Sequence, residues 1–359
     1  MTPRISRKIF PSLLRDPRRG SVVIFVLGII LLAAFLITRL MDRAAVDLAA
    51  ESKVTKRADM RQEALSALEA SLAVLADESA VRSGLHDTSE GWDHPLTLLD
   101  YQPSAGYTVE SVVEDESGKL SLPGADEAAL SEYLDAIGCP ATAQDELVDA
   151  LFVWTKPDYL SVEGNTDGGT FASAALPYAA PQRAMRSFAE LRAIPAAREL
   201  FFDEHGEWNE LGRRFRSGAS LFAFSASNVN SARSEVLLAR GLDAARVAAI
   251  TLAREDKNSR TSFFRSAAEL AGAWGRDATP PGLGTEALCL QVVVTVKFGA
   301  RDYRLEAWVQ PGSAAAIATG RRQTKEGDAA QLPVSVRNNP RKSMDYPFQI
   351  LELRENDGT

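Results

Sequence analysis

Cysteine and histidine are scarce in this chain of 359 residues, which contains two cysteines and three histidines. Two cysteines cannot build a disulfide scaffold or a four-cysteine zinc site. The sequence also lacks the nucleophile elbow G-x-S-x-G, the Walker phosphate loop, the dinucleotide fingerprint G-x-G-x-x-G and a C-x-x-C pair. Missing motifs do not exclude an enzyme, because paired carboxylates leave no signature, but nothing points to a catalytic group, and we expect no enzymatic activity, no resident metal and no cofactor.

Basic residues are fewer than acidic residues in this chain, and they are unevenly distributed. The chain has 40 Lys and Arg against 48 Asp and Glu, a net charge of −8. Nucleic-acid binders normally present a basic face, so we expect no nucleic-acid partner. Residues 1–20 nevertheless contain six basic residues and one acidic residue, a net +5 that leaves −13 for residues 21–359.

A long uncharged apolar run, residues 21–38, directly follows this basic segment. Eighteen helical residues span about 27 Å, close to the thickness of a bilayer core. By the positive-inside rule the basic leader stays in the cytoplasm and the chain after Arg39 crosses the membrane. The sequence therefore predicts a single-pass protein whose globular part lies on the far side of the membrane, which in a bacterium is the periplasm for an inner-membrane protein.

A cleaved secretory signal peptide would have a shorter apolar core and a small-x-small cleavage site, and neither is present here. A plain signal anchor remains a simple alternative. The basic leader, however, ends in Arg18-Arg19-Gly20, and the apolar run begins abruptly at Ser21. This pattern resembles the processing site of type IV pilins and of the pseudopilins of type II secretion. The resemblance implies that prepilin peptidase cuts between Gly20 and Ser21 and methylates the new amino terminus.

The rest of the chain predicts an α+β fold. Residues 21–80 read as one long helix, because leucines recur at three- and four-residue steps in its second half. Residues 107–122 and 288–309 each read as a hairpin. Between them the composition favours helices, at 129–137, 143–154, 187–194, 197–202, 234–240 and 244–253. After Pro311 the chain is polar, and we expect a loose tail apart from residues 348–353.

Five segments resemble, in order, motifs of the general secretion pathway protein K family, the large minor pseudopilin of type II secretion. They are Glu114–Leu122, Glu146–Trp154, Ser187–Pro195, Asn228–Leu237 and Arg301–Ala307. Each motif is weak alone, but the ordered set covers most of residues 18–309. Most pilins have Glu at the fifth mature position, whereas this family typically lacks it, so Phe25 supports the resemblance.

The resemblance implies a type IV pilin-like fold, with a long N-terminal transmembrane helix packed on a small antiparallel sheet and a large inserted all-α domain. We expect a leader at 1–20, the long helix at 21–80 with its transmembrane part at 21–38, and the β part at 81–125 and 285–310. The inserted domain would then cover 126–284 and the tail 311–359.

The function implied by the resemblance is that of a minor pseudopilin at the tip of the pseudopilus, which helps to initiate its assembly. Its partners would be other minor pseudopilins, the major pseudopilin, prepilin peptidase and the inner membrane. Phe25 would determine the tip position, because it cannot provide the carboxylate that pairs with a neighbouring amino terminus. The alternative is an anchored periplasmic binding protein or enzyme that is never processed as a pilin.

Four further sets of residues are candidates for a metal site, a structural amide contact or a disulfide. Residues 156–169 resemble the first half of a calcium loop, but the twelfth position is Ala174 instead of an acid, so calcium binding is possible while a solvated loop is the default. The group His86, Asp87, Glu90, Asp93 and His94 contains Gly91 and Pro95, so no helix holds it at zinc-ligand spacing, and we expect a polar loop.

The other two sets are amides and thiols. Asn228 and Asn230 precede a predicted helix, and we expect them to satisfy turn amides and cap that helix. Cys139 and Cys289 could pair in an oxidising compartment or remain as two buried thiols, and the sequence does not decide between these states.

Overall fold

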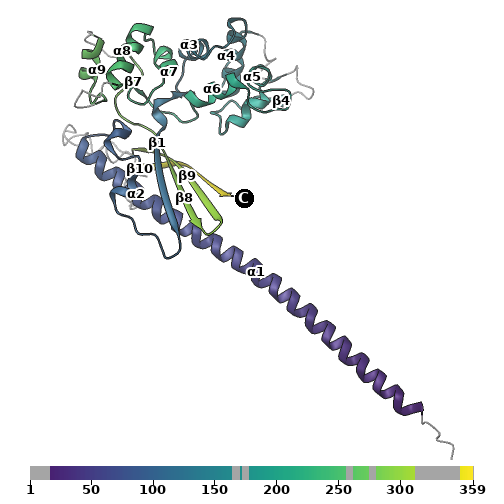
Figure 1. The fold of residues 1–359 in the computed structure, drawn as a ribbon. Helices are drawn as coiled ribbons and strands as arrows, with labels where there is room; N and C mark the ends of the chain where they lie inside the picture. The colour runs from purple at the N-terminus through teal and green to yellow at the C-terminus, as the bar shows by residue number, and fades with distance from the viewer. Residues whose placement is uncertain are drawn as a thin grey trace, which may run out of the picture. The chain divides into compact units, whose positions relative to one another are not determined.

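The structure is a computed structural model that describes residues 17–163, 170–171, 178–255, 262–274, 280–311 and 348–358. The chain divides into two units, Met1–Asp59 and Met60–Thr359. The long helix predicted at 21–80 is confirmed as α1, which begins at Pro17 and ends at Arg82 (Figure 1). Proline suits the first turn of a helix, and the chain leaves the helix through two positive φ angles, at Ser83 and Gly84.

The first unit contains the apolar part of α1. Val22–Leu48 forms a helix that is long and apolar enough to cross a membrane, with a mean hydropathy of 2.7. The segment predicted to span the membrane, 21–38, falls at the start of this stretch. The large apolar side chains described there are exposed, Phe25 among them at 70%. Such a surface is typical of a helix that lies in lipid or packs against other apolar helices.

The second unit is built on a four-stranded antiparallel sheet. Its strands, in spatial order, are β1 (Thr108–Asp115), β8 (Leu290–Phe298), β9 (Arg301–Pro311) and β10 (Phe348–Gly358). Side chains alternate along β8, so that Val292, Val294 and Val296 are fully buried while the residues between them are partly exposed. This alternation, which is a property of strands, places one face of the sheet in the core.

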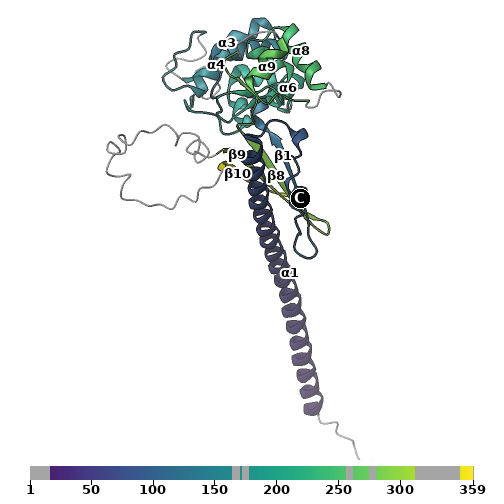
Figure 2. The ribbon, with the colours of Figure 1, turned by 90° about the vertical axis from the view of Figure 1, so that its left-hand side faces the viewer.

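The last part of α1, from Met60, covers that buried face. Helix and sheet share one apolar core, to which α1 contributes Met60, Ala64, Ala67, Leu68, Leu72 and Leu75. The three- and four-residue steps between these positions put them on one side of the helix. Figure 2 shows the strands beside this part of α1. The expected packing of the long helix on a small antiparallel sheet is therefore confirmed.

Two details of the sheet differ from the sequence analysis. The hairpin predicted at 107–122 is wrong, because β1 pairs with β8, while β2 (Leu120–Ser121) pairs in parallel with β5 (Ala219–Ser220). The hairpin predicted at 288–309 is confirmed as β8 and β9. The apolar stretch noted in the tail, 348–353, belongs to β10, so part of the expected tail completes the sheet.

The described residues between Asp126 and Leu283 are mainly helical, and we call them the helical block. Its longer elements are α3 (Glu127–Ala136), α4 (Ala141–Thr155), η3 (Phe188–Ala193), α5 (Pro195–Phe201), α6 (Glu210–Gly218), α7 (Ser234–Ala239), α8 (Ala244–Glu255) and α9 (Ala267–Trp274). Figure 2 shows these helices gathered into one body. They surround their own apolar core, in which Tyr133, Leu147, Phe201 and Phe215 are fully buried.

Five of the six helices predicted in the block are confirmed as α3, α4, α5, α7 and α8, whereas 187–194 forms the 3₁₀ helix η3. Helices α6 and α9 were not predicted from the sequence. Helix α6 contains two glycines and few apolar residues, and it forms because Asn209 caps it and Phe215 is buried. Tertiary packing overrides weak helix propensity there.

Glu190 is the main polar contact that holds η3 against α4. Its carboxylate accepts hydrogen bonds from the Trp154 indole at 2.9 Å and from the Arg186 backbone N–H at 2.8 Å. Arg183 forms an ion pair with it at 3.2 Å. Burial raises the pKa of Glu190, but these donors outweigh burial and leave the pKa below its ordinary value.

Substituting Glu190→Gln is expected to lower the free energy of unfolding by about 1–3 kcal/mol at neutral pH, because a charged acceptor is replaced by a neutral one. A carboxyl whose pKa is lowered by folding stabilises the fold above its unfolded pKa of about 4.3, and this contribution is lost as the pH falls through the folded pKa. Denaturant unfolding at several pH values checks this. The difference between wild type and variant should shrink below about pH 4, and a constant difference would contradict the assignment.

Candidate functional site

The predicted processing residues lie at the start of α1. Gly20 and Ser21 are within the helix, and Phe25 projects from its exposed apolar surface. No ionisable side chain occurs between Ser21 and Thr38. The cleavage after Gly20, the methylation of Ser21 and the role of Phe25 stay predictions, and α1 is compatible with all three.

Two of the motifs noted in the sequence meet where the sheet joins the helical block. The Asn228 side chain donates from Nδ2 to Asp115 Oδ2 at 2.7 Å and to the His86 carbonyl at 2.8 Å. The Ser231 hydroxyl donates to the same Asp115 oxygen. We call His86, Asp115, Asn228, Asn230 and Ser231 the junction residues. They bring together three segments that are far apart in the chain.

Asp115 is the acceptor at the centre of this contact. Its other carboxylate oxygen accepts hydrogen bonds from the Ser117 backbone N–H at 2.9 Å and from the Ser117 hydroxyl at 2.6 Å. Desolvation in the junction raises the pKa of the Asp115 carboxyl, and the hydrogen bonds from Ser117, Ser231 and Asn228 act in the opposite direction. The donors around the carboxylate thus come both from the turn that follows β1 and from the helical block.

Asn230 is almost completely buried, with 2% of its surface exposed. Its Nδ2 lies 2.9 Å from the Phe264 carbonyl, 3.0 Å from the Thr285 carbonyl and 3.3 Å from the His86 carbonyl. Its Oδ1 accepts the Phe264 backbone N–H at 2.8 Å. The predicted helix-capping role is wrong, because the residue before α7 is Arg233 and makes no side-chain cap. The predicted turn contact is present, since Asn228 Oδ1 accepts the Asn230 N–H.

The acidic and histidine-containing stretch after α1 forms a compact corner. Asp87 and Glu90 form a capping box around the short 3₁₀ helix η1 (Thr88–Glu90). Glu90 also accepts the Trp92 indole N–H at 3.2 Å, and His86 Nδ1 lies 3.5 Å from the second Glu90 oxygen. The expected polar loop is therefore partly buried. Among the described residues, no group of three His, Cys, Asp or Glu side chains is placed to hold a metal ion.

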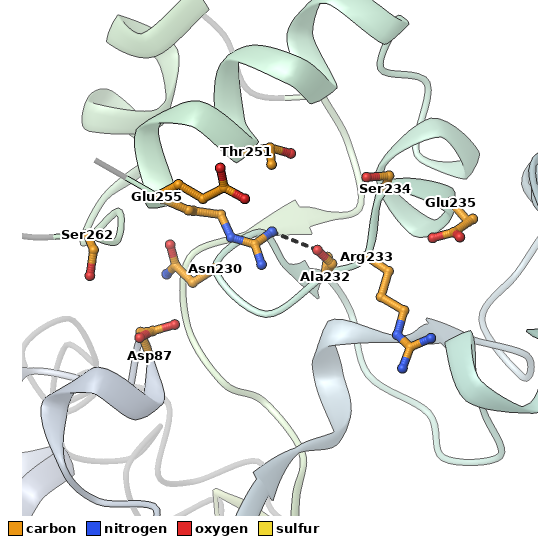
Figure 3. Close-up of a pocket in the computed structure, with 10 residues that line it drawn as sticks. Asp87, Asn230, Ala232, Arg233, Ser234, Glu235, Thr251, Glu255 and Ser262 are labelled. Carbon is orange, nitrogen blue, oxygen red and sulfur yellow. Dashed lines mark hydrogen bonds between the residues drawn. The ribbon is translucent and has the colours of Figure 1, made fainter. Parts of the chain in front are cut away.

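A recess of about 500 Å³ lies beside the junction (Figure 3). Its charged lining consists of Asp87, Arg233, Glu235, Arg254 and Glu255. Arg254 donates to the Ala232 carbonyl at 2.8 Å, the dashed contact in Figure 3. In Figure 3 the acidic side chains are spread around the recess, and the lining also contains two arginines. In the described lining, no group of three His, Cys, Asp or Glu side chains is placed to hold a metal ion.

The possible calcium loop at 156–169 is only partly described by the structure. Most of the possible calcium ligands in 156–169, and Ala174, lie outside the described residues. The described start of that loop is held by the buried Asp149, which accepts hydrogen bonds from Ser161 at 2.6 Å and from the Val162 N–H at 2.8 Å.

Cys139 and Cys289 are both buried free thiols. Burial raises the pKa of each of these thiols, which makes them unreactive.

This chain is similar to a protein family in sequence and to a solved structure in fold. Residues 109–203 match the family model of the type II secretion system (T2SS) protein K. No match is found among curated proteins. Among solved structures, the chain is similar to a chain in the crystal structure of the GspK-GspI-GspJ complex from the enterotoxigenic Escherichia coli type 2 secretion system. The TM-score is 0.55 at 10% sequence identity, over 85% of this chain and 99% of that chain.

At 10% identity the structural likeness shows the fold alone, whereas the family match rests on sequence. The match begins in β1 and extends through the first part of the helical block, where three of the five motifs lie. The resemblance to protein K of type II secretion that the sequence predicts is thus confirmed over residues 109–203, and this chain shares the fold of a protein from that secretion system.

Proposed function

We propose that this chain is a minor pseudopilin of a type II protein secretion system. The observation that carries the proposal is the combination of the protein K match in residues 109–203 with a pilin-like helix and sheet interrupted by a helical block. A fold alone does not determine a function. The sequence match and the exposed apolar helix supply the further evidence.

The apolar helix has two successive roles in this proposal. It first anchors the precursor in the inner membrane, with the leader in the cytoplasm and the second unit in the periplasm. After removal of the leader it packs among the helices of other subunits. The uncharged surface of Val22–Thr38 suits both environments, because neither lipid nor an apolar helix bundle requires a charge to be buried.

The partners proposed for the chain follow from the solved complex and from the leader. The similar structure contains GspK, GspI and GspJ together, so we propose other minor pseudopilins as direct partners. The major pseudopilin would follow them in the filament. Prepilin peptidase would act on the Gly20–Ser21 bond. Export of folded proteins across the outer membrane would be the process that this assembly serves.

A position at the tip of the pseudopilus is supported by two features of the chain. A subunit inside the filament would pair a carboxylate at this position with the amino terminus of the subunit ahead of it. Phe25 has no carboxylate and cannot make this pair. The described part of the helical block is large, with eight helices from α3 to α9, and would obstruct regular lateral packing. Both features are compatible with a subunit that starts the filament.

The mature amino terminus tests the proposal directly. We expect mass spectrometry of the protein from cells with a type II secretion system to find a chain that begins at N-methylated Ser21. Crosslinking should then capture other pilin-like subunits. An intact Met1, or a cut at another bond, would favour the alternative of an anchored periplasmic binding protein or enzyme. Exclusive self-association would contradict the tip complex.

A further inference from the structure

We propose that the junction residues form a rigid joint, so that the helical block and the four-stranded sheet move as one body and not as two hinged domains. The proposal concerns the second unit alone, and it does not depend on a role in secretion. An insertion joined to its host by two chain crossings normally has freedom to pivot, because interfaces between domains are small and polar. The contacts at this junction oppose such a motion.

The amide contacts at the junction are buried and numerous. Asn230 alone contacts the backbone of His86 after α1, of Phe264 in the helical block and of Thr285 just before β8. Asn228 adds the His86 carbonyl and the Asp115 carboxylate. Both amides are buried. A pivot would leave these polar groups without partners away from water, which is unfavourable.

The backbones of the sheet and of the helical block approach each other closely at the junction. Gly118 follows β1 in the 3₁₀ helix η2 (Glu116–Gly118) and lies against Ser231 of the helical block. A β-carbon added at Gly118 would lie 2.5 Å from Ser231 Oγ and 2.9 Å from the Ser231 carbonyl carbon. The absence of a side chain at this position lets the two segments come into direct contact. Packing this dense leaves little room for a change of angle.

The helical block has a second point of attachment on another strand of the sheet. Trp308 of β9 stacks on Phe222 of the helical block, with ring centroids 5.4 Å apart. Next to it, the Gln310 amide donates to the Ala223 carbonyl. Because β8 separates β9 from β1, this contact lies about 10 Å across the sheet from Asp115. Two separated contacts restrict rotation about either one.

The joint can be tested by measuring a distance across it in the full chain in detergent. Spin labels would be placed at Glu110→Cys on β1 and at Leu252→Cys on α8, both of which are exposed. The native Cys139 and Cys289 are buried and should remain unlabelled. Double electron–electron resonance should give one narrow distance distribution for the otherwise wild-type chain. A broad or multimodal distribution would overturn the proposal.

The variant Asn230→Ala should widen that distribution and remove hydrogen-exchange protection from the Phe264 amide, which donates to Asn230. The matched control is Asn209→Ala. Asn209 Oδ1 accepts the Gly212 N–H inside the helical block. Loss of this hydrogen bond should remove hydrogen-exchange protection from the Gly212 amide and leave the distance distribution narrow.

A folded Asn230→Ala protein with an unchanged distribution would overturn the proposal. If circular dichroism shows that this variant does not fold, Asn228→Ser is the second variant. Serine keeps a polar group in the turn but cannot reach both Asp115 and His86. A widened distribution in that variant supports the joint, and a narrow one contradicts it.

Discussion

Replacing Gly20 by isoleucine is expected to leave the precursor uncut and to abolish the function of the chain in secretion. In the proposed function the peptidase cuts after a residue that has no side chain, and a branched side chain would occupy the space next to the scissile bond. The uncut leader carries a net charge of +5. Each basic side chain taken into the bilayer centre costs about 3 kcal/mol, so the uncut helix should stay in the membrane.

The measurement is the size of the protein in membrane fractions, combined with the appearance of a type II substrate in the medium. Gly28→Ala is the matched control, because Gly28 lies on the same apolar helix and an added β-carbon meets no atom within 4 Å. We expect normal processing and secretion for Gly28→Ala. Normal processing of Gly20→Ile would show that Gly20 is not the cleavage residue.

Sequence patterns predicted the elements whose signals are local. The periodic leucines of α1 and the Gly-Ala turn between β8 and β9 each lie within a few residues of the groups they arrange. The partner of β1 could not be found in this way, because Val113 pairs with Val292 across the whole helical block. The chain after β1 is diverted by Asp115, which holds the Ser117 N–H and starts the 3₁₀ helix η2.

The junction shows a different limit of sequence reasoning. Asp115 and Asn228 lie in two separate segments that both resemble protein K motifs, but nothing in either segment indicates that they touch. An asparagine before a helix is a common cap, and that local rule predicted the wrong role for Asn230. Its use is instead decided by carbonyl groups from His86, Phe264 and Thr285, which only the folded chain assembles.

Replacing Gly212 by alanine is expected to destabilise the helical block severely. Gly212 lies in α6 where the helix passes over α5, and an added β-carbon would lie 2.3 Å from the Phe201 carbonyl oxygen and 2.7 Å from the Trp208 ring. The carbonyl cannot move without disturbing α5, and the ring packs on Phe202 at 4.3 Å between centroids. Overpacking of this kind costs about 3 kcal/mol or more, well above the small gain in helix propensity from alanine.

A second helical glycine separates this steric effect from helix propensity. Gly272 lies in α9, where an added β-carbon has no neighbour within 4 Å. Gly272→Ala should therefore raise the free energy of unfolding by about 0.5–1 kcal/mol, because alanine loses less backbone entropy in a helix. Denaturant unfolding of both variants at neutral pH gives the comparison. Changes of opposite sign in the free energy of unfolding would show that contact with Phe201 and Trp208 requires glycine at position 212. Similar small changes in both variants would mean that α6 can shift away from α5. The helical block would then be packed less tightly than its buried residues indicate.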